Sequence, residues 1–282
     1  MGTKMDDLQY GNELFQQRAR KTLPYLVRQA KAGQKIYYSD LAKEIGIPNA
    51  RNLNHILGLI GDSLIDLGKI EKVQIPPIQC LVVSKSTELP GDGITYFIST
   101  KKFNTLTKTE KHKVVNIQLT DIFTYKKWDW ILMKLGLKPI LFNLNKELQN
   151  AKKYKSVGES IHHKKLKEFI ANNPSVLGLK NIEKGKTEYS LPSADKIDVV
   201  FDDNGLRIGI EVKSFISDVS DILRGLFQCV KYKYLIEAEQ TIKDEFPNSK
   251  VILAIQCKLP KELQPVKNLL GIEVIENIKI KI

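Results

Sequence analysis

Two carboxylates and a lysine stand close together in two short apolar segments of this chain. Asp198 lies in the run KIDVVF, and Glu211 and Lys213 lie in LRIGIEVKS, which follows after the turn DDNG. Carboxylate oxygens are preferred ligands of hard divalent ions such as Mg²⁺, and a metal-activated water can attack phosphorus. A lysine beside such a site can orient the water or offset charge on the phosphate. These side chains therefore predict metal-dependent phosphodiester hydrolysis.

The elements that must position these side chains are two strands joined by a tight turn. Side chains alternate between the faces of a strand, so Glu211 and Lys213 share one face of a predicted strand over 206–213, opposite the apolar residues. DDNG is a hairpin turn signal, and a hairpin brings Asp198 beside Glu211. The backbone carbonyl of Val212 is a further candidate metal ligand. The alternative is a solvated strand face with cross-strand ion pairs.

A third carboxylate precedes these strands. Residues 157–172 predict a helix, and on its helical wheel Glu159 lies among apolar residues whereas Glu168 lies on the far side. An inward-facing carboxylate needs a partner or a metal, so Glu159 is a candidate site residue. The alternative is an acid in the first turn that suits the helix dipole. His162 and His163 are interpreted as surface or packing residues, with a phosphate contact from His163 left open.

The segment after the second strand predicts a helix with two stripes. One stripe is apolar and is expected to be buried, and it consists of Val219, Leu223, Leu226 and Val230. The opposite stripe holds Asp221, Gly225, Gln228 and Tyr232 at helical spacing. This second stripe either faces solvent or lines a groove where the site opens, and Gly225 would permit close backbone approach. A strand over 250–256, a helix over 261–270 and a strand over 272–276 follow.

The order of these elements, with KIDVVF, IEVKS and RGLFQCVKY, resembles the PD-(D/E)xK nuclease superfamily over about residues 157–256. The resemblance implies that Asp198 and Glu211 bind the metal and that Lys213 is the catalytic lysine. It implies that Gln228 and Tyr232 support the site, as in branches with a Gln-x-x-x-Tyr motif. Ile197 stands where the motif's proline would be. The resemblance implies Glu159 less firmly, because the helix acid of this superfamily varies in position.

The first part of the chain predicts a helix-turn-helix. A helix over 11–31 precedes a short helix, LAKEIG, which ends at Gly46, and a second helix is expected over 50–59 after the turn IPNA. The runs 78–84 and 94–100 are strand-like and suggest a wing. The alternative is an ordinary helical domain with a hairpin.

The segment YYSDLAKEIGIPNARNLNHIL resembles the DNA-binding half of alkyltransferase-like proteins. That family carries a tyrosine before a helix and an Ala-Arg pair that opens the recognition helix, and its arginine enters the stack of a duplex. The resemblance implies that Tyr38 and Arg51 contact DNA. The reactive Pro-Cys-His-Arg motif of that family is absent, and Cys80 is interpreted as a buried strand residue.

Composition limits the class of protein. The 282 residues are 42% hydrophobic with a net charge of +12, which favours a globular protein with a polyanionic partner. No apolar run is long enough to span a membrane, no secretory signal is evident, and three unpaired cysteines suit the cytoplasm. We expect an α/β fold with two domains. A mostly helical winged helix-turn-helix-type domain occupies 1–145, and a restriction endonuclease-like mixed sheet flanked by helices occupies 150–282, after a linker over 143–158.

These observations predict a metal-dependent endodeoxyribonuclease that uses Mg²⁺, with Mn²⁺ able to substitute. Double-stranded DNA is the expected partner, no membrane is involved, and a homodimer would match a palindromic site. A restriction or defence enzyme is the leading expectation. The alternatives are a repair or structure-specific nuclease acting on DNA or RNA, and a regulator that binds DNA on a nuclease fold without cutting it.

Overall fold

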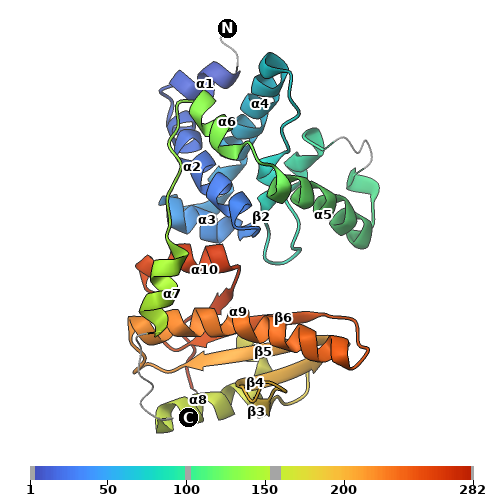
Figure 1. Cartoon of the computed structure of the whole chain (residues 1–282), viewed down its shortest axis with the longest axis vertical. Helices are drawn as coiled ribbons and strands as arrows, with labels where there is room; N and C mark the ends of the chain where they lie inside the picture. The colour runs from blue at the N-terminus through green and yellow to red at the C-terminus, as the bar shows by residue number, and fades with distance from the viewer. Residues whose placement is uncertain (1–3, 99–102, 153–159, 281–282) are drawn as a thin grey trace. The chain divides into compact units, whose positions relative to one another are not determined.

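The computed structural model describes residues 4–98, 103–152 and 160–280, and the chain divides into two compact units (Figure 1). They are Met1–Phe142, which is mostly helical, and Asn143–Ile282, which is a mixed α/β unit. Each unit has a buried apolar cluster of its own. No helix within the described ranges is long and apolar enough to cross a membrane.

The second unit is built on a five-stranded mixed sheet with the strand order β3-β4-β5-β6-β7. Its first three strands pair in antiparallel fashion, and β5, β6 and β7 run parallel. The strands are β3 (Lys186–Ser190), β4 (Lys196–Asp203), β5 (Leu206–Lys213), β6 (Ser249–Ile255) and β7 (Glu273–Ile275). The strand that carries Glu211 and Lys213 therefore lies at the centre of the sheet.

A two-residue turn joins β4 to β5, as the sequence predicts. Asn204 and Gly205 have φ values of 47° and 87°, and this left-handed pair matches the right-handed twist of the flanking strands. The strand pairing runs from Asp203 opposite Leu206 to Val199 opposite Ile210. The ladder ends there, and the next residue, Asp198, bonds through its side chain to the backbone N–H of Val212, beside Glu211. The hairpin therefore does bring Asp198 close to Glu211, whose pKa it raises.

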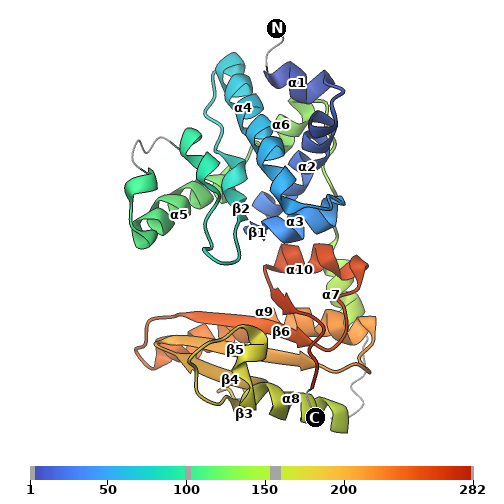
Figure 2. The ribbon, with the colours of Figure 1, turned by 180° about the vertical axis from the view of Figure 1, so that it is seen from behind.

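Helices cover both faces of the central strand. On one face, Leu166 and Ile170 of α8 (Ile161–Asn172) join the apolar side chains of β4 and β5 in one cluster. On the other, α9 (Val219–Ile242) packs along β5 and β6, and it crosses in front of the strands in Figure 1 and behind them in Figure 2. The unit is completed by α10 (Gln264–Leu270), which also contacts α9, and by two short 3₁₀ helices, η5 (Pro174–Leu177) and η6 (Lys261–Leu263).

The predicted linker over 143–158 is wrong for most of its described length. Residues Leu144–Lys152 form the helix α7, which packs against α9, and Ala151 is buried. The segment has few apolar residues, so its sequence pattern is weak. Its helical state depends on docking against a neighbour, which periodicity alone does not report.

The first unit contains the expected helix pair. The predicted helix over 11–31 is α2 (Leu14–Lys31), and α3 (Tyr38–Ile45) ends at Gly46, whose φ of 76° gives the left-handed cap expected of glycine. A single 3₁₀ turn, η1 (Ala50–Asn52), leads into α4 (Leu53–Glu71). The second helix therefore extends well beyond the predicted end at residue 59. The remaining helices are α1 (Lys4–Tyr10), α5 (Lys108–Thr124) and α6 (Trp128–Lys134).

The predicted wing does not form in the described residues. Of the run 78–84, only Val82–Val83 (β2) is a strand, after the 3₁₀ helix η2 (Ile78–Leu81), and it pairs in parallel with β1 (Ile36–Tyr37). Where the second wing strand was expected, Asp92–Tyr96 forms another 3₁₀ helix, η3, and Phe103–Thr105 forms η4. Backbone N–H groups of Ile94 and Phe97 bond to carbonyls three residues earlier, so this segment satisfies them locally without a strand partner.

Candidate active site

The carboxylate of Asp198 lies where β4 separates from β5. Its Oδ2 accepts a hydrogen bond of 2.8 Å from the backbone N–H of Val212, and its Oδ1 lies 3.1 Å from Nε2 of His163 on α8. On the amino-terminal side of Val199, β4 is irregular, because residues two apart in a regular strand share a face. Ile197 lies beside Gly209 on the α9 side of the sheet, whereas Val199 joins the cluster on the α8 side. Asp198 is thus held by the backbone of the central strand β5 and by a side chain of α8.

Glu211 and Lys213 are buried, with 3% and 5% of their surfaces exposed. The interpretation of this strand face as solvated is therefore wrong, because α9 covers it. Nζ of Lys213 lies 3.1 Å from Oε1 of Glu211. Burying a charged pair is costly, and removing either partner would leave an uncompensated charge.

The pKa values of Glu211 and His163 are both shifted by their surroundings. Burial, and then the negative charge of Asp198, raise the pKa of Glu211 to about 7, although Lys213 and His163 oppose the shift. Burial lowers the pKa of His163, but the hydrogen bond to Asp198 and its charge outweigh that effect, so the pKa stands above its ordinary value. A carboxyl group with a pKa near neutrality beside a second carboxylate is a setting in which a cation can replace a proton.

Lys213 has a second carboxylate partner that comes from α9. Its Nζ lies 2.9 Å from Oδ1 of Asp221, which is 8% exposed. Burial disfavours the charged form of Lys213, but the charges of Glu211 and Asp221 outweigh this and raise the pKa of the lysine. Lys213 therefore stays protonated, and it can act as a hydrogen-bond donor rather than as a base.

The helix stripe that contains Gln228 and Tyr232 faces the sheet. Tyr232 is buried, and its hydroxyl accepts a 3.2 Å hydrogen bond from Nε2 of Gln228. Burial and the charge of Glu211 raise the pKa of Tyr232, so the phenol stays neutral. Oε1 of Gln228 is buried and has no hydrogen-bond partner among the described residues. The solvent-face alternative is thus wrong for this stripe. On the apolar stripe, Leu223 and Leu226 are buried and Val219 is exposed.

Gly225 allows close approach of α9 to the site, as expected. A Cβ atom at this position would lie 2.9 Å from Cδ1 of Leu253 and 3.0 Å from Cε of Lys213. Gly209 of β5 also lies where the helix and the sheet approach closely. A Cβ atom there would meet Ile236 at 3.2 Å, so this glycine lets α9 pack on β5.

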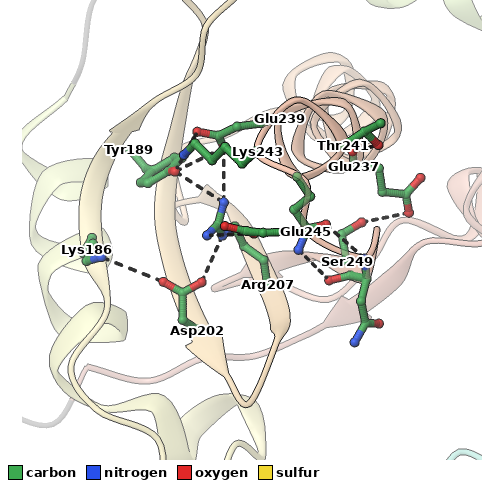
Figure 3. Close-up of polar contacts among 12 residues, drawn as sticks. Lys186, Tyr189, Asp202, Arg207, Glu237, Glu239, Thr241, Lys243, Glu245 and Ser249 are labelled. Atoms are coloured by element: carbon green, nitrogen blue, oxygen red, sulfur yellow. Dashed lines mark hydrogen bonds and ion pairs between the residues drawn. The ribbon is translucent and has the colours of Figure 1, made fainter.

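Arg207 shares the predicted polar face of β5 but belongs to a different cluster. It pairs with Asp202 at 2.9 Å and with Glu239 at 3.3 Å, and Glu239 also pairs with Lys243. Figure 3 shows these contacts, which tie the amino end of β5 to the last turns of α9. Arg207 therefore fastens the helix to the sheet and leaves the other end of the strand for Glu211 and Lys213.

The donor set partly suits a divalent cation. Among the residues that the structure describes, no three His, Cys, Asp or Glu side chains form a ready-made metal group. Asp198 and Glu211 supply two carboxylates, and Mg²⁺ in proteins is often bound by one or two carboxylates while it keeps several waters. The pKa of Glu211 is raised by burial and then by Asp198, and a cation between the two carboxylates would offset their repulsion. The predicted carbonyl ligand of Val212 stays a prediction, and Glu159 lies outside the described residues.

The two residues expected to contact DNA differ in exposure. Arg51 is exposed on η1, where its backbone N–H donates to Oδ1 of Asn49. Tyr38 is partly buried, and its hydroxyl accepts a hydrogen bond from the Gly91 N–H at 3.2 Å. Tyr38 also lines a cavity of about 640 Å³ in the first unit, beside the buried amide of Gln79.

Cys80 is buried as expected, but it lies in η2 rather than in a strand. Burial raises the pKa of its thiol to about 12. A thiol this hard to deprotonate is a poor nucleophile at neutral pH, which agrees with the absence of an alkyl-transfer motif.

Sequence reasoning missed two residues that contact the site. His163 was interpreted as a surface or packing residue, although its place near the apolar face of its helix was a signal that it points inward. Asp221 was placed on the same helix stripe as Gly225 and Tyr232, but the sequence left open whether that stripe faces solvent or the site. The i, i+4 spacing of Asp221 from Gly225 was the signal available for it.

No family model, no curated protein and no solved structure matches this chain.

Proposed function

We propose that this protein is a metal-dependent deoxyribonuclease that hydrolyses phosphodiester bonds. The observation that carries the proposal is the buried Glu211–Lys213 pair beside Asp198, where the pKa of Glu211 is raised to about 7. Structural ion pairs also perturb pKa values. Here, however, two carboxylates and a lysine lie close together at the end of a hairpin. Packing of the apolar core does not explain why acids occupy these two positions.

Each residue has a role in this proposal. Asp198 and Glu211, with the Val212 carbonyl, would hold Mg²⁺ or Mn²⁺, which supplies an activated water and offsets phosphate charge. His163 and the Val212 N–H orient the Asp198 carboxylate. Lys213 donates hydrogen bonds to the attacking water or to a phosphate oxygen, which stabilises charge that develops on the phosphorus. Gln228 and Tyr232 support the site from α9.

The proposal assigns DNA binding to the first unit. Its helix pair α3 and α4 and the exposed Arg51 are suited to a duplex, with phosphate contacts setting position and side chains such as Tyr38 and Arg51 reaching further in. The net charge of +12 supports a polyanionic partner. The setting that we propose is defence against foreign DNA, as in a restriction enzyme.

The test is cleavage of supercoiled plasmid by purified protein with Mg²⁺. We expect nicking or cutting that stops with a chelator and that falls at least about a hundredfold in Asp198→Ala and in Lys213→Ala, because each removes a group that acts in the transition state. The matched control is Arg207→Lys, a charged residue of the same strand outside the site. Undiminished cutting by Asp198→Ala or Lys213→Ala would overturn the assignment.

A wild-type protein that shifts DNA in gels with every divalent metal and cuts none of it would favour the regulator alternative. Where cutting occurs, sequencing of the ends made from genomic DNA separates the remaining readings. Defined ends support restriction, and preference for flaps or junctions over plain duplex supports a repair nuclease.

A further inference from the structure

Lys213 lies between two carboxylates that differ in their other partners. Glu211 comes from the same strand and lies beside Asp198, whereas Asp221 comes from the first turn of α9 and contacts Lys213 at 2.9 Å. In the proposed reaction Glu211 binds the metal ion, so its electron pairs are shared with that ion. The carboxylate of Asp221 contacts Lys213 and has no assigned role in binding the metal ion.

Helix capping does not explain Asp221. The N-cap of α9 is Asp218, whose Oδ1 accepts the N–H of Asp221 itself at 2.8 Å. The carboxylate of Asp221 is free to reach the sheet, and it is almost fully buried there. An acid in a helix first turn gains from the helix dipole, but that gain does not require burial, which is costly for an unpaired carboxylate.

The lysine stem is confined as well. Cε of Lys213 lies 3.0 Å from where a Cβ atom of Gly225 would be, one turn along α9 from Asp221. The stem therefore fits against helix backbone, and the ammonium group is fixed at its end by Asp221. An ammonium group has three donors, and two are directed at Glu211 and Asp221, which leaves the third for a ligand.

We infer that Asp221 is a positioning residue that keeps the ammonium group of Lys213 aimed at the scissile phosphate when Glu211 is engaged by the metal ion. This inference rests on the proposed nuclease function. Asp221 acts through Lys213 and does not itself touch the substrate.

The test compares variants in single-turnover plasmid cleavage with saturating Mg²⁺. In Asp221→Asn, which keeps the side-chain volume, we expect the cleavage rate to fall about 10- to 100-fold while the DNA concentration for half-maximal rate is unchanged, because misplacement of a catalytic group reduces the chemical step. Asp218→Asn is the matched control. It removes a charge from the same helix end, keeps a capping oxygen and does not contact Lys213.

A double-mutant cycle separates positioning from a merely structural role. In a Lys213→Gln background, adding Asp221→Asn should change the residual rate less than about twofold, since the effect is transmitted through the lysine. Thermal unfolding of each variant checks that the chain is folded, and Asp221→Glu provides a second, charge-retaining variant that should cut faster than Asp221→Asn.

The outcomes are distinguishable. Equal rates for wild type and Asp221→Asn, or a further tenfold loss in the Lys213→Gln background, would overturn the role of Asp221 and leave the nuclease assignment intact. A wild-type chain that cuts no DNA would overturn the nuclease assignment and this inference together.

Discussion

Glu211 is a buried acid whose environment changes its protonation. Its raised pKa comes first from burial and then from Asp198, so folding of the metal-free chain favours the protonated acid. A group whose pKa is higher in the folded state than in the unfolded state contributes stability at low pH and loses it as pH rises through the folded value. For Glu211 this window runs from the ordinary value of 4.5 to about 7.

We therefore predict that, with a chelator present, the free energy of unfolding of the wild type falls between pH 5 and pH 8 relative to that of Glu211→Gln. The amide cannot ionise, so the difference between the two unfolding free energies should shift towards Glu211→Gln by on the order of 1–3 kcal/mol from pH 5 to pH 8, whatever its value at pH 5. Urea unfolding at both pH values measures it. His163, whose pKa is also raised, acts in the same direction in both proteins. Parallel pH curves for the two chains would contradict a perturbed Glu211.

At the residue scale, the sequence was sufficient where the chemistry is local. Strand alternation placed Glu211 and Lys213 on one face, and the turn residues predicted that Asp198 lies near Glu211. It was insufficient for His163 and Asp221, because their contacts depend on how two helices dock on the sheet. Glu211 is buried because α9 docks on this strand face. The sequence alone could not exclude a solvated face, since it does not show where α9 docks.

At the element scale, α9 determines what the site is. It covers the polar face of β5, supplies Asp221, and approaches closely because Gly225 has no side chain. The periodicity predicted this helix and the burial of Leu223 and Leu226, but it did not decide between solvent and the site for the stripe of Asp221 and Tyr232. The stripe with more polar residues is buried as well, because Asp221 meets the charged end of β5.

Gly225→Ala is predicted to destabilise the chain by about 1–3 kcal/mol, since an added methyl group overfills a well-packed contact. It should also slow plasmid cleavage, because the methyl group would press on Cε of Lys213. Gly58→Ala in α4 is the control. Nothing lies within 4 Å of an added Cβ there, so helix propensity should make that change neutral or stabilising by up to about 1 kcal/mol. Chemical denaturation measures the free energy of unfolding of both variants. An unchanged value for Gly225→Ala would contradict the close approach of α9 to the sheet.

Other elements show where local pattern is overridden. The second helix of the helix pair continues far past its predicted end, because Ile60, Leu64 and Leu67 extend its buried face. In the described part of the expected wing strand, 94–98, no residue pairs with a strand, and residues 94–96 end the 3₁₀ helix η3. Strands depend on partners distant in sequence, so apolar runs alone predict them poorly.

At the scale of the whole molecule, the candidate site is contained in one unit. His163, Asp198, Glu211, Lys213 and Asp221 all lie within Asn143–Ile282, which has its own apolar cluster around α8, β4 and β5. The residues expected to contact DNA, Tyr38 and Arg51, lie in Met1–Phe142. Cleavage and DNA affinity should therefore be separable.

A fragment of residues 143–282 is predicted to fold and to bind Mg²⁺, seen as a rise in melting temperature with added metal, because a ligand that binds only the folded state stabilises it. Glu211→Gln in the same fragment should lose most of that rise. The fragment should bind DNA more weakly than the full chain, with a shallower salt dependence, because fewer phosphate contacts remain. Equal affinity and salt slope for fragment and full chain would show that the first unit does not bind the DNA.

The Asn204–Gly205 turn has a consequence for the order in which this protein folds. Asp198 and Glu211 belong to a single hairpin, so bringing them together closes a short loop and can occur on the microsecond scale typical of hairpins. Asp221 reaches Lys213 only after α9 docks, and only then is Glu211 removed from water. Between about pH 4.5 and 7, helix docking rather than hairpin formation is thus the folding step at which we expect the metal-free chain to take up a proton.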